Sequence, residues 1–327
     1  MTLEERYAIM TLPRNNFFEN TALKNQMALT NMFHHKQGDE MSDNSEEMTL
    51  SEKITYSTVL IRATYSDGSY STGTGFIINL CKNKVTQTVV PLIITNWHVV
   101  EGSVHTQFEF CLMNDAGRPI DEKAYPIVYD SGAWMHHPDP TVDLCCLPLA
   151  FALTDLDSRN VKLFYIPLEP ELIPNDKTIK SLSAMEEIAM VGYPIGLSDM
   201  YNHKPIIRRG ITATHVKKDY QGKREFLVDM ACFPGSSGSP IFVLNEGIYH
   251  EGNNACAGSR IMLVGILYAG PQYSATGELV VMSIPNRPFT VTNIPTNLGV
   301  AIKAERILDF EDFFKDEALD QNTQDSN

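Results

Sequence analysis

The stretch ACFPGSSGSPIF, residues 231–242, sets glycine, serine and proline between two apolar runs. Glycine lets the backbone enter tight turns that residues with a Cβ resist. Gly235 and Gly238 therefore predict a turn whose successive N–H groups point at one spot, a nest that can hold an anion. We interpret Ser237, inside this turn, as a candidate nucleophile. The alternative is an ordinary hairpin loop, because Gly and Ser are common turn formers.

A serine nucleophile needs a base, a carboxylate that holds the base in the right tautomer, and donors for the oxyanion. His98 lies where the apolar run LIIT meets a polar turn, and Asp143 begins the apolar run DLCCLPL. A carboxylate among apolar neighbours is costly to bury without a partner, and His98 suits that role. The backbone N–H groups of Gly235 and Ser237 are the predicted oxyanion donors. Taken singly, His98 also fits a structural histidine, and Asp143 a turn cap.

The other eight histidines lack such a context, and we interpret them as solvated or structural. One of them, His215, is a further candidate for lining a substrate cleft. The eight are His34, His35, His105, His136, His137, His203, His215 and His250.

Short β-branched and aromatic runs begin at Ile54 and form two consecutive series, separated by turn residues at the spacing typical of sandwiches and barrels. No pattern of helix length separates them, which argues against parallel βαβ units. The sequence therefore predicts an all-β protein of two sequential antiparallel β-barrels. After the last run, Ile307, Phe310 and Phe314 recur at i, i+3 and i+7, which predicts a C-terminal α-helix.

These patterns divide the chain into five segments. We expect a polar, poorly ordered N-terminal extension at 1–50, the first β-barrel at 51–160 and the second at 161–303. A C-terminal helix at 304–315 and an acidic, disordered tail at 316–327 follow.

The net charge of −14 comes mainly from the two ends, and the middle of the chain is close to neutral. This balance argues against a nucleic-acid partner. No apolar run is long enough to span a membrane, and the N-terminus lacks the basic start of a secretory signal. We therefore expect a cytoplasmic protein with no membrane partner. The six cysteines show no C-x-x-C pair, which favours reduced thiols over a disulfide framework and gives no metal site.

Seven motifs resemble, in this order, those of trypsin-like serine peptidases of the chymotrypsin fold. The form is closest to bacterial proteins with a trypsin-like peptidase domain and more distantly similar to HtrA-type proteases. The resemblance covers about residues 54–310. The motifs are TGTGFIINL, ITNWHVV, VDLCCL, VGYPIG, FPGSSGSPIF, LVGILYAG and NLGVAIKAERI.

The resemblance implies two six-stranded barrels with a catalytic triad in the cleft between them. It makes His98 the general base, Asp143 the orienting carboxylate and Ser237 the nucleophile, at intervals of 45 and 94 residues in the family order. It also implies no cofactor. The segment Tyr268, Ala269, Gly270 resembles the strand that pairs with the substrate backbone.

Two positions depart from well-known members of this family. Ser236 stands where zymogen-activated relatives carry an Asp that pairs with a freshly cleaved N-terminus, so activation by such cleavage is not expected. Ala231 stands where trypsin has an acid at the base of its specificity pocket. We therefore expect an uncharged, small-to-medium side chain at P1 rather than Lys or Arg, although Asp229 could still reach the pocket.

The sequence thus predicts a serine endopeptidase with a polypeptide substrate. The alternative is a partner-activated or catalytically silent binding module on the same fold. Seven bases against one acid between Lys204 and Arg224 predict a solvated hairpin face. They also fit a docking site for an acidic regulatory partner or for the chain's own acidic tail.

Overall fold

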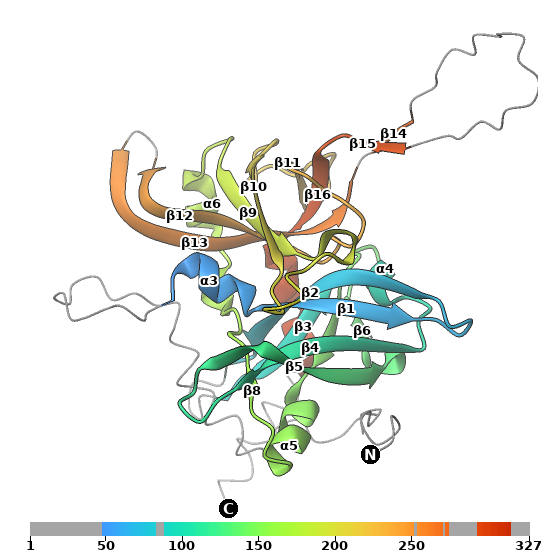
Figure 1. Cartoon of the computed structure of the whole chain (residues 1–327). Coiled ribbons are helices and arrows are strands. Elements are labelled where there is room, and N and C mark those ends of the chain that lie inside the picture. Colours follow the sequence, from blue (N-terminus) through green and yellow to red (C-terminus); the bar gives the residue numbers. More distant parts are fainter. Residues whose placement is uncertain (1–47, 83–87, 252–253, 271, 275–292, 315–327) are drawn as a thin grey trace, which may run out of the picture.

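A computed structural model describes residues 48–82, 88–251, 254–270, 272–274 and 293–314 (Figure 1). Strands dominate, and the helices are short. The strands are β1 (Thr58–Thr64), β2 (Tyr70–Leu80), β3 (Val90–Thr95), β4 (His105–Met113), β5 (Pro119–Asp130), β6 (Met135–His136), β7 (Cys145–Pro148), β8 (Leu163–Phe164), β9 (Glu187–Gly192), β10 (Ile206–Thr212), β11 (Glu225–Asp229), β12 (Pro240–Glu251), β13 (Asn254–Ala269), β14 (Gln272–Ser274), β15 (Asn293–Pro295) and β16 (Leu298–Lys303). The helices are α3 (Leu50–Thr55), α4 (Trp97–Val100), η3 (Ser131–Ala133), α5 (Ala150–Ser158), η4 (Pro170–Leu172), α6 (Asp176–Ser181), η5 (Pro194–Gly196) and η6 (Ala304–Phe314).

The first sheet runs in the order β5-β4-β1-β2-β3-β7-β6, with β8 paired to β4. Its strand pairs are antiparallel. It has eight strands where the family resemblance implied six, because the two-residue strand β6 extends the sheet beyond β7 and the two-residue strand β8 pairs with β4. In the described residues β5 and β6 are not paired, so hydrogen bonds do not close this sheet into a ring.

The second sheet is a closed barrel in the order β10-β11-β16-β13-β12-β9. This is the predicted six-stranded barrel. The predicted fold class, all-β with two consecutive antiparallel units, is confirmed. The nine-residue helix α5, which lies between β7 and β8 along the chain, was not predicted.

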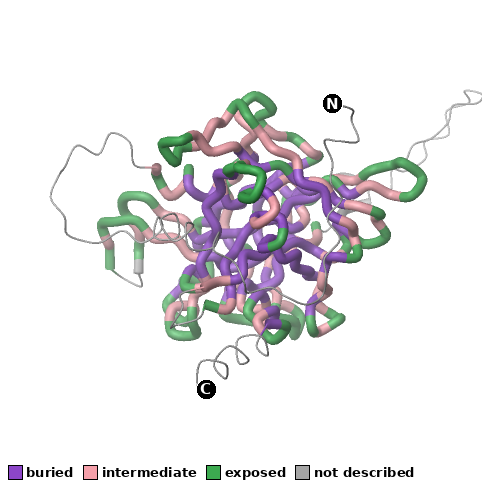
Figure 2. The backbone as a smooth tube through the Cα atoms, turned by 90° about the horizontal axis from the view of Figure 1, so that it is seen from below, coloured by how far each residue is buried: buried purple, intermediate pink, exposed green. Residues whose placement is uncertain are grey.

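Three apolar clusters form the core of the protein. One lies in the first sheet, around Ile61 and Phe108, and one lies in the second barrel, around Phe226 and Val243. The third joins both sheets, because Phe76 and Ile94 of the first pack in one cluster with Phe242 of the second. Figure 2 shows the buried backbone gathered in the middle of the molecule and the exposed turns around it. The junction between the sheets is therefore part of the core.

The C-terminal helix differs in type from the prediction. η6 is a 3₁₀-helix over Ala304–Phe314 rather than an α-helix. Side chains three residues apart eclipse in a 3₁₀-helix. This aligns Ala304, Ile307 and Phe310 on one buried stripe, and Phe314 is buried as well. The apolar positions were predicted correctly, but the three-residue step from Ile307 to Phe310 occurs in both helix types.

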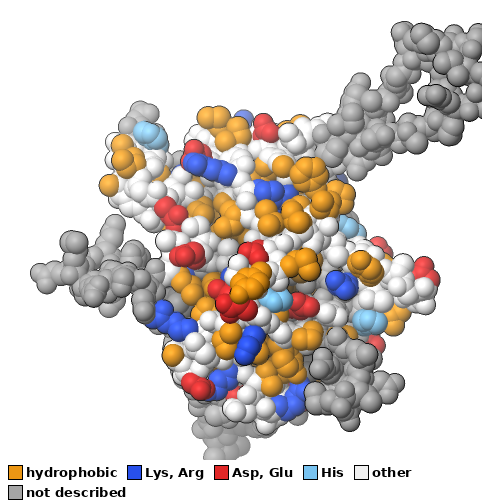
Figure 3. Space-filling model, viewed as in Figure 1, with side chains coloured by type: hydrophobic (Ala, Val, Ile, Leu, Met, Phe, Trp, Pro, Cys, Tyr) orange, Lys and Arg blue, Asp and Glu red, His pale blue; other side chains and the backbone are white. Residues whose placement is uncertain are grey.

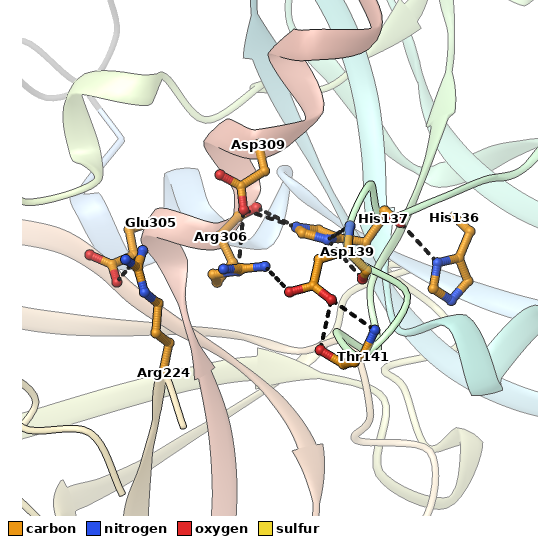
Figure 4. A network of polar contacts seen from close by, with 8 residues as sticks. All are labelled: His136, His137, Asp139, Thr141, Arg224, Glu305, Arg306 and Asp309. Atoms are coloured by element: carbon orange, nitrogen blue, oxygen red, sulfur yellow. Dashed lines mark hydrogen bonds and ion pairs between the residues drawn. The ribbon is translucent and has the colours of Figure 1, made fainter. Parts of the chain in front are cut away.

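A polar network fixes η6 to the loop that leads to β7 (Figure 4). The Arg306 guanidinium contacts Asp139 at 2.9 Å and Asp309 at 3.2 Å. The buried His137 ring accepts the Asp139 N–H at Nδ1 and bonds the Arg306 carbonyl through Nε2. The interpretation of His137 as structural agrees with these contacts.

Several predictions fall outside the described residues. They include residues 1–47 of the predicted extension and the whole acidic tail at 316–327. The division of the chain into five segments remains a proposal. All six cysteines lie in the described part, and none of them forms a disulfide bond. In the described part, no helix is both long and apolar enough to cross a membrane.

The segment between the sheets is tied to β2. The Asn79 N–H donates to the Leu168 carbonyl, and Asn79 Nδ2 donates to Glu169 Oε1 at 2.8 Å. Glu169 is 3% exposed. Burial, reinforced by the negative charge of Glu171, raises the pKa of Glu169 to about 7. The folded protein therefore holds this proton at a pH where the unfolded chain has released it.

This pKa predicts a specific pH dependence of stability. Between about pH 4.5 and 7 the folded state binds more protons at Glu169 than the unfolded state, so the free energy of unfolding falls as the pH rises through this range. Glu169→Gln cannot titrate, and its stability relative to wild type should rise from pH 5 to pH 8. Urea unfolding at four pH values measures the difference. Glu171→Gln, at an exposed position, is the control and should show a much smaller trend. A constant difference between wild type and Glu169→Gln would contradict the assignment.

The packing of η6 gives a second prediction. Phe310 is fully buried and lies edge-on to the His137 ring at 5.2 Å, whereas Phe313 is 38% exposed. Phe310→Ala should lower the free energy of unfolding by about 3–5 kcal/mol, because it leaves a cavity in the core shared by both sheets. Phe313→Ala should cost less than about 1 kcal/mol. Urea titrations of both variants test this, and equal losses would show that η6 is not packed as described.

Candidate active site

The loop of residues 230–239 joins β11 to β12 and carries Ser237. Three backbone hydrogen bonds shape it: Ser236 N–H to Phe233 O, Ser239 N–H to Ser236 O, and Gly238 N–H to Leu267 O. The last of these ties the loop to β13. Ser237 itself is half-buried. The stretch is therefore a fixed turn next to a barrel strand rather than a free hairpin loop.

Two glycines make this turn possible. Gly235 and Gly238 have φ angles of 83° and 85°, in the left-handed region that favours glycine. A Cβ on Gly238 would lie 1.9 Å from the Thr74 carbonyl oxygen, so no side chain fits there. The close approach brings the loop of the second barrel against β2 of the first sheet.

His98 and Asp143 are brought together by strand pairing. β3 and β7 pair with Thr95 opposite Cys145, so the residues that follow β3 face those that precede β7. The Asp143 carboxylate accepts the backbone N–H of His98 at 3.0 Å, and its second oxygen lies 2.5 Å from His98 Nδ1. One carboxylate thus holds both the backbone and the ring of His98.

This contact decides which ring nitrogen of His98 carries the proton. An ionised carboxylate only accepts hydrogen bonds, so Nδ1 donates and Nε2 keeps its lone pair. The His98 side chain is 44% exposed and that of Asp143 is 26% exposed. The imidazole is therefore oriented and open to solvent, as a proton acceptor needs to be.

Ser237 approaches this pair through the backbone. Thr74 N–H donates to the Ser237 carbonyl, and the Thr95 hydroxyl donates to the Thr74 carbonyl. Thr95 stands three residues before His98. In the described part of the chain the Ser237 hydroxyl makes no hydrogen bond with His98, so the structure joins two of the three predicted triad residues directly and the third through β2.

The predicted oxyanion donors are free to bind. Neither the Gly235 N–H nor the Ser237 N–H donates to any described residue, although the amides of Ser236, Gly238 and Ser239 beside them all do. Unpaired backbone amides in a folded protein are uncommon. Two of them on either side of Ser236 are suited to a developing negative charge.

The predicted substrate-binding residues lie beside the serine loop. Tyr268 stands at a β-bulge, where the pairing of β13 with β16 shifts between Leu267 and Ala269. Bulges re-aim side chains and are common next to active sites. Burial raises the pKa of Tyr268, and so do the negative charge of Glu225, a hydrogen bond to the Glu225 carboxylate and, least of these, the charge of Asp143. Gly270 follows β13 directly, and a Cβ there would lie 3.8 Å from the Cys232 Cβ.

His215 does not join this group. Its Nδ1 accepts the Lys217 N–H at 3.4 Å, and in the described residues no hydrogen bond or ion pair links it to His98, Asp143 or Ser237. The bases of the 204–224 stretch are also dispersed. Three of the seven pair singly with acids of other elements: Lys204 with Asp121, Arg209 with Glu187 and Arg224 with Glu305. On the face of the molecule drawn in Figure 3, acidic and basic side chains are mixed.

Thr74 is a site residue that the sequence analysis missed. Its hydroxyl donates to the Gly235 carbonyl and accepts the Tyr193 N–H, each at 3.0 Å. It is fully buried. The residue belongs to the motif TGTGF, which is a weak signal because nothing in the sequence says what its hydroxyl contacts.

Comparisons with known proteins agree with this geometry. A family model described as trypsin-like peptidase domain matches residues 73–247, more than half of the chain. The match includes His98, Asp143 and Ser237. No curated protein sequence matches the chain significantly.

Solved structures with a similar fold are distant. The HtrA-type protease AlgW with a tripeptide shares 13% identity at a TM-score of 0.40, covering 80% of this chain and 61% of AlgW. This chain thus spans about three fifths of AlgW. The Rv3671c protease from M. tuberculosis, in its active form, shares 14% identity at a TM-score of 0.38, covering 78% of each chain. The MamO protease domain from Magnetospirillum magneticum shares 12% identity at 0.37, covering 79% of this chain and 97% of that domain. The assignment rests on the family model alone.

The role of Thr74 is testable. Thr74→Val keeps the shape of the side chain but removes the hydroxyl that holds Gly235 and Tyr193. A small displacement of a reacting group can cost on the order of 10²-fold in rate, so we expect Ser237 to react with a fluorophosphonate about 10 to 100 times more slowly. Thr106→Val is the control, because Thr106 is equally buried but bonds Trp134 in the first sheet. Equal reactivity of the two variants would remove Thr74 from the site.

Proposed function

Because the chain belongs to the trypsin-like peptidase domain family, we propose that it is a serine endopeptidase that hydrolyses peptide bonds through an acyl-enzyme. The observation that carries the proposal is that the Asp143 carboxylate bonds both the backbone N–H and the ring of His98. The buried residues Thr74 and Thr95 connect this pair to Ser237. The family assignment supports peptidase chemistry in general. The roles of individual residues rest on this geometry.

In the first half-reaction the Ser237 hydroxyl attacks the carbonyl carbon of the substrate while His98 Nε2 takes the hydroxyl proton. The charge that forms on the substrate oxygen is stabilised by the free amides of Gly235 and Ser237. Asp143 stabilises the imidazolium. His98 then gives the proton to the leaving amine, and the acyl group stays on Ser237.

In the second half-reaction water replaces the amine. His98 takes a proton from the water as it attacks the acyl carbon, and returns that proton to Ser237 when the acid product leaves. Every step uses side chains and amides of this chain with no cofactor. The solvent-facing imidazole gives water access to the base.

Three features bear on which substrates the proposed enzyme would cut and on how it would be activated. We propose that the backbone of Tyr268, Ala269 and Gly270, at the end of β13, pairs with the substrate; the position of Gly270 beside Cys232 of the serine loop supports this. Ala231 contributes no negative charge that would select Lys or Arg. Ser236 is buried and its hydroxyl has no partner in the described residues, so it offers no carboxylate to a new N-terminus. We therefore propose an enzyme that needs no N-terminal cleavage and does not select basic residues.

None of the six cysteines forms a disulfide in the described residues. We propose that the protein acts in the cytoplasm, because thiols stay reduced there. A regulatory partner also belongs to the proposal. The observation that favours it is the missing hydrogen bond between Ser237 and His98. An alternative function follows from the same observation: a binding module whose triad is completed only when a partner reshapes the serine loop.

Labelling with a fluorophosphonate probe distinguishes the two. We expect the purified wild type to be labelled, Ser237→Ala not at all, and His98→Ala at least about 10³-fold more slowly, because removing the base abolishes activation of the serine. His105→Ala, in the first sheet and away from the loop, is the control and should label like wild type. A folded wild type that is not labelled would contradict the endopeptidase proposal and support the binding module.

A further inference from the structure

Arg208 occupies an unusual place in the second barrel. Along β10 the exposed residues alternate with less exposed ones: Ile207 and Arg209 are exposed, and Arg208 lies between them on the inner side. The outer Arg209 pairs with Glu187 of β9. Arg208 therefore carries its positive charge toward the inside of the barrel, where apolar or small side chains are the rule.

The guanidinium of Arg208 is only partly satisfied. Nη1 donates to the Ala231 carbonyl at 2.5 Å. Nε and Nη2 are buried and have no hydrogen-bond partner, and no carboxylate in the described part of the chain forms an ion pair with this residue. Leaving a charged group buried and unpaired is strongly unfavourable. Such an arrangement persists where an anion completes it.

The neighbours do not supply that anion. The Cys232 thiol lies close to Arg208, but burial raises its pKa to about 11, so it stays neutral at physiological pH. Asp229, which the sequence analysis considered for the pocket, is exposed at the end of β11 and makes no ion pair with Arg208. The positive charge thus remains uncompensated.

The position of this charge ties it to the substrate. Ala231 and Cys232 stand six and five residues before Ser237 in the same loop. Gly270, at the end of the proposed substrate-binding segment, borders Cys232 and has no side chain of its own to fill the space. The Arg208 guanidinium therefore lies behind the residues that we propose to hold the substrate side chain.

We propose that Arg208 is the specificity-determining residue of this site and that it binds the carboxylate of an Asp or Glu side chain at the P1 position of the substrate. The inference rests on the proposed function. It replaces the expectation of an uncharged P1 residue, because the sequence does not reveal that Arg208 turns inward toward Ala231. A guanidinium offers two parallel N–H donors that match a carboxylate. Since Nε and Nη2 are covered, side chains around Cys232 must move aside when the substrate enters.

The test compares peptidyl phosphonate probes that differ only at P1, with Glu, Gln, Ala or Lys. We expect wild type to react with the Glu probe at least about tenfold faster than with the isosteric Gln probe, because only the carboxylate pairs with the buried cation. Arg208→Met should lose this preference and react with the Glu and Gln probes at similar rates. Arg208→Lys should keep part of it. Arg209→Met, the outward neighbour paired with Glu187, is the matched control and should behave like wild type.

Two readouts keep failures apart. Fluorophosphonate labelling of every variant reports on the nucleophile alone, so normal labelling with no preference for Glu over Gln overturns the role of Arg208 and leaves the peptidase intact. Absence of labelling in the folded wild type overturns both proposals.

Thermal unfolding adds a test that needs no substrate. An unpaired buried cation kept for binding predicts a Tm that is unchanged or raised in Arg208→Met, because replacing an uncompensated charge by an apolar side chain often stabilises. A Tm lowered by more than about 5 °C in that variant would show a structural role instead.

Discussion

The hydrogen bonds of Thr74 are the constraint on which the rest of the site depends. Its N–H, carbonyl and hydroxyl join Ser237, Thr95, Gly235 and Tyr193, which come from three different segments of the chain. Inside a buried region each such bond is costly to leave unmade, so the four segments have one favourable arrangement. Gly238 lets the backbones come close enough for these bonds to form. The relative position of the proposed nucleophile and base therefore depends on one residue of β2.

This arrangement also depends on how the two sheets share their core. Phe76 lies two residues from Thr74 and packs in the cluster that includes Phe242, two residues from the turn that follows Ser237. The same burial that stabilises the junction thus sets the spacing of the polar groups above it. Because the site is assembled from both sheets, it forms only when both have folded, and local unfolding of either sheet would disrupt it.

The residues of the proposed site could be singled out from the sequence because they lie in short motifs. His98, Asp143 and Ser237 each stand at the border of an apolar run, and Gly235 and Gly238 reveal the turn. Other features depend on contacts between distant segments and have no local signal. The inward direction of Arg208 follows from the register of β10 on β9, and the role of Thr74 from contacts more than a hundred residues away. The three-residue step from Ile307 to Phe310 occurs in an α-helix and in a 3₁₀-helix. The helix α5 is too short to show a helical period.

The network of η6 has a consequence for where this chain can end. Arg306 and the buried His137 hold the loop that, through the Asp139 carbonyl and the Val142 N–H, leads into Asp143. The helix that follows the last strand therefore supports the loop leading to Asp143, the carboxylate proposed to orient the base, although it is distant from that loop in the sequence. Shortening the chain to residue 303 would leave both sheets with all their described strands and still remove the support behind the proposed catalytic pair. In this architecture a short helix outside both sheets contributes to the geometry of the proposed active site.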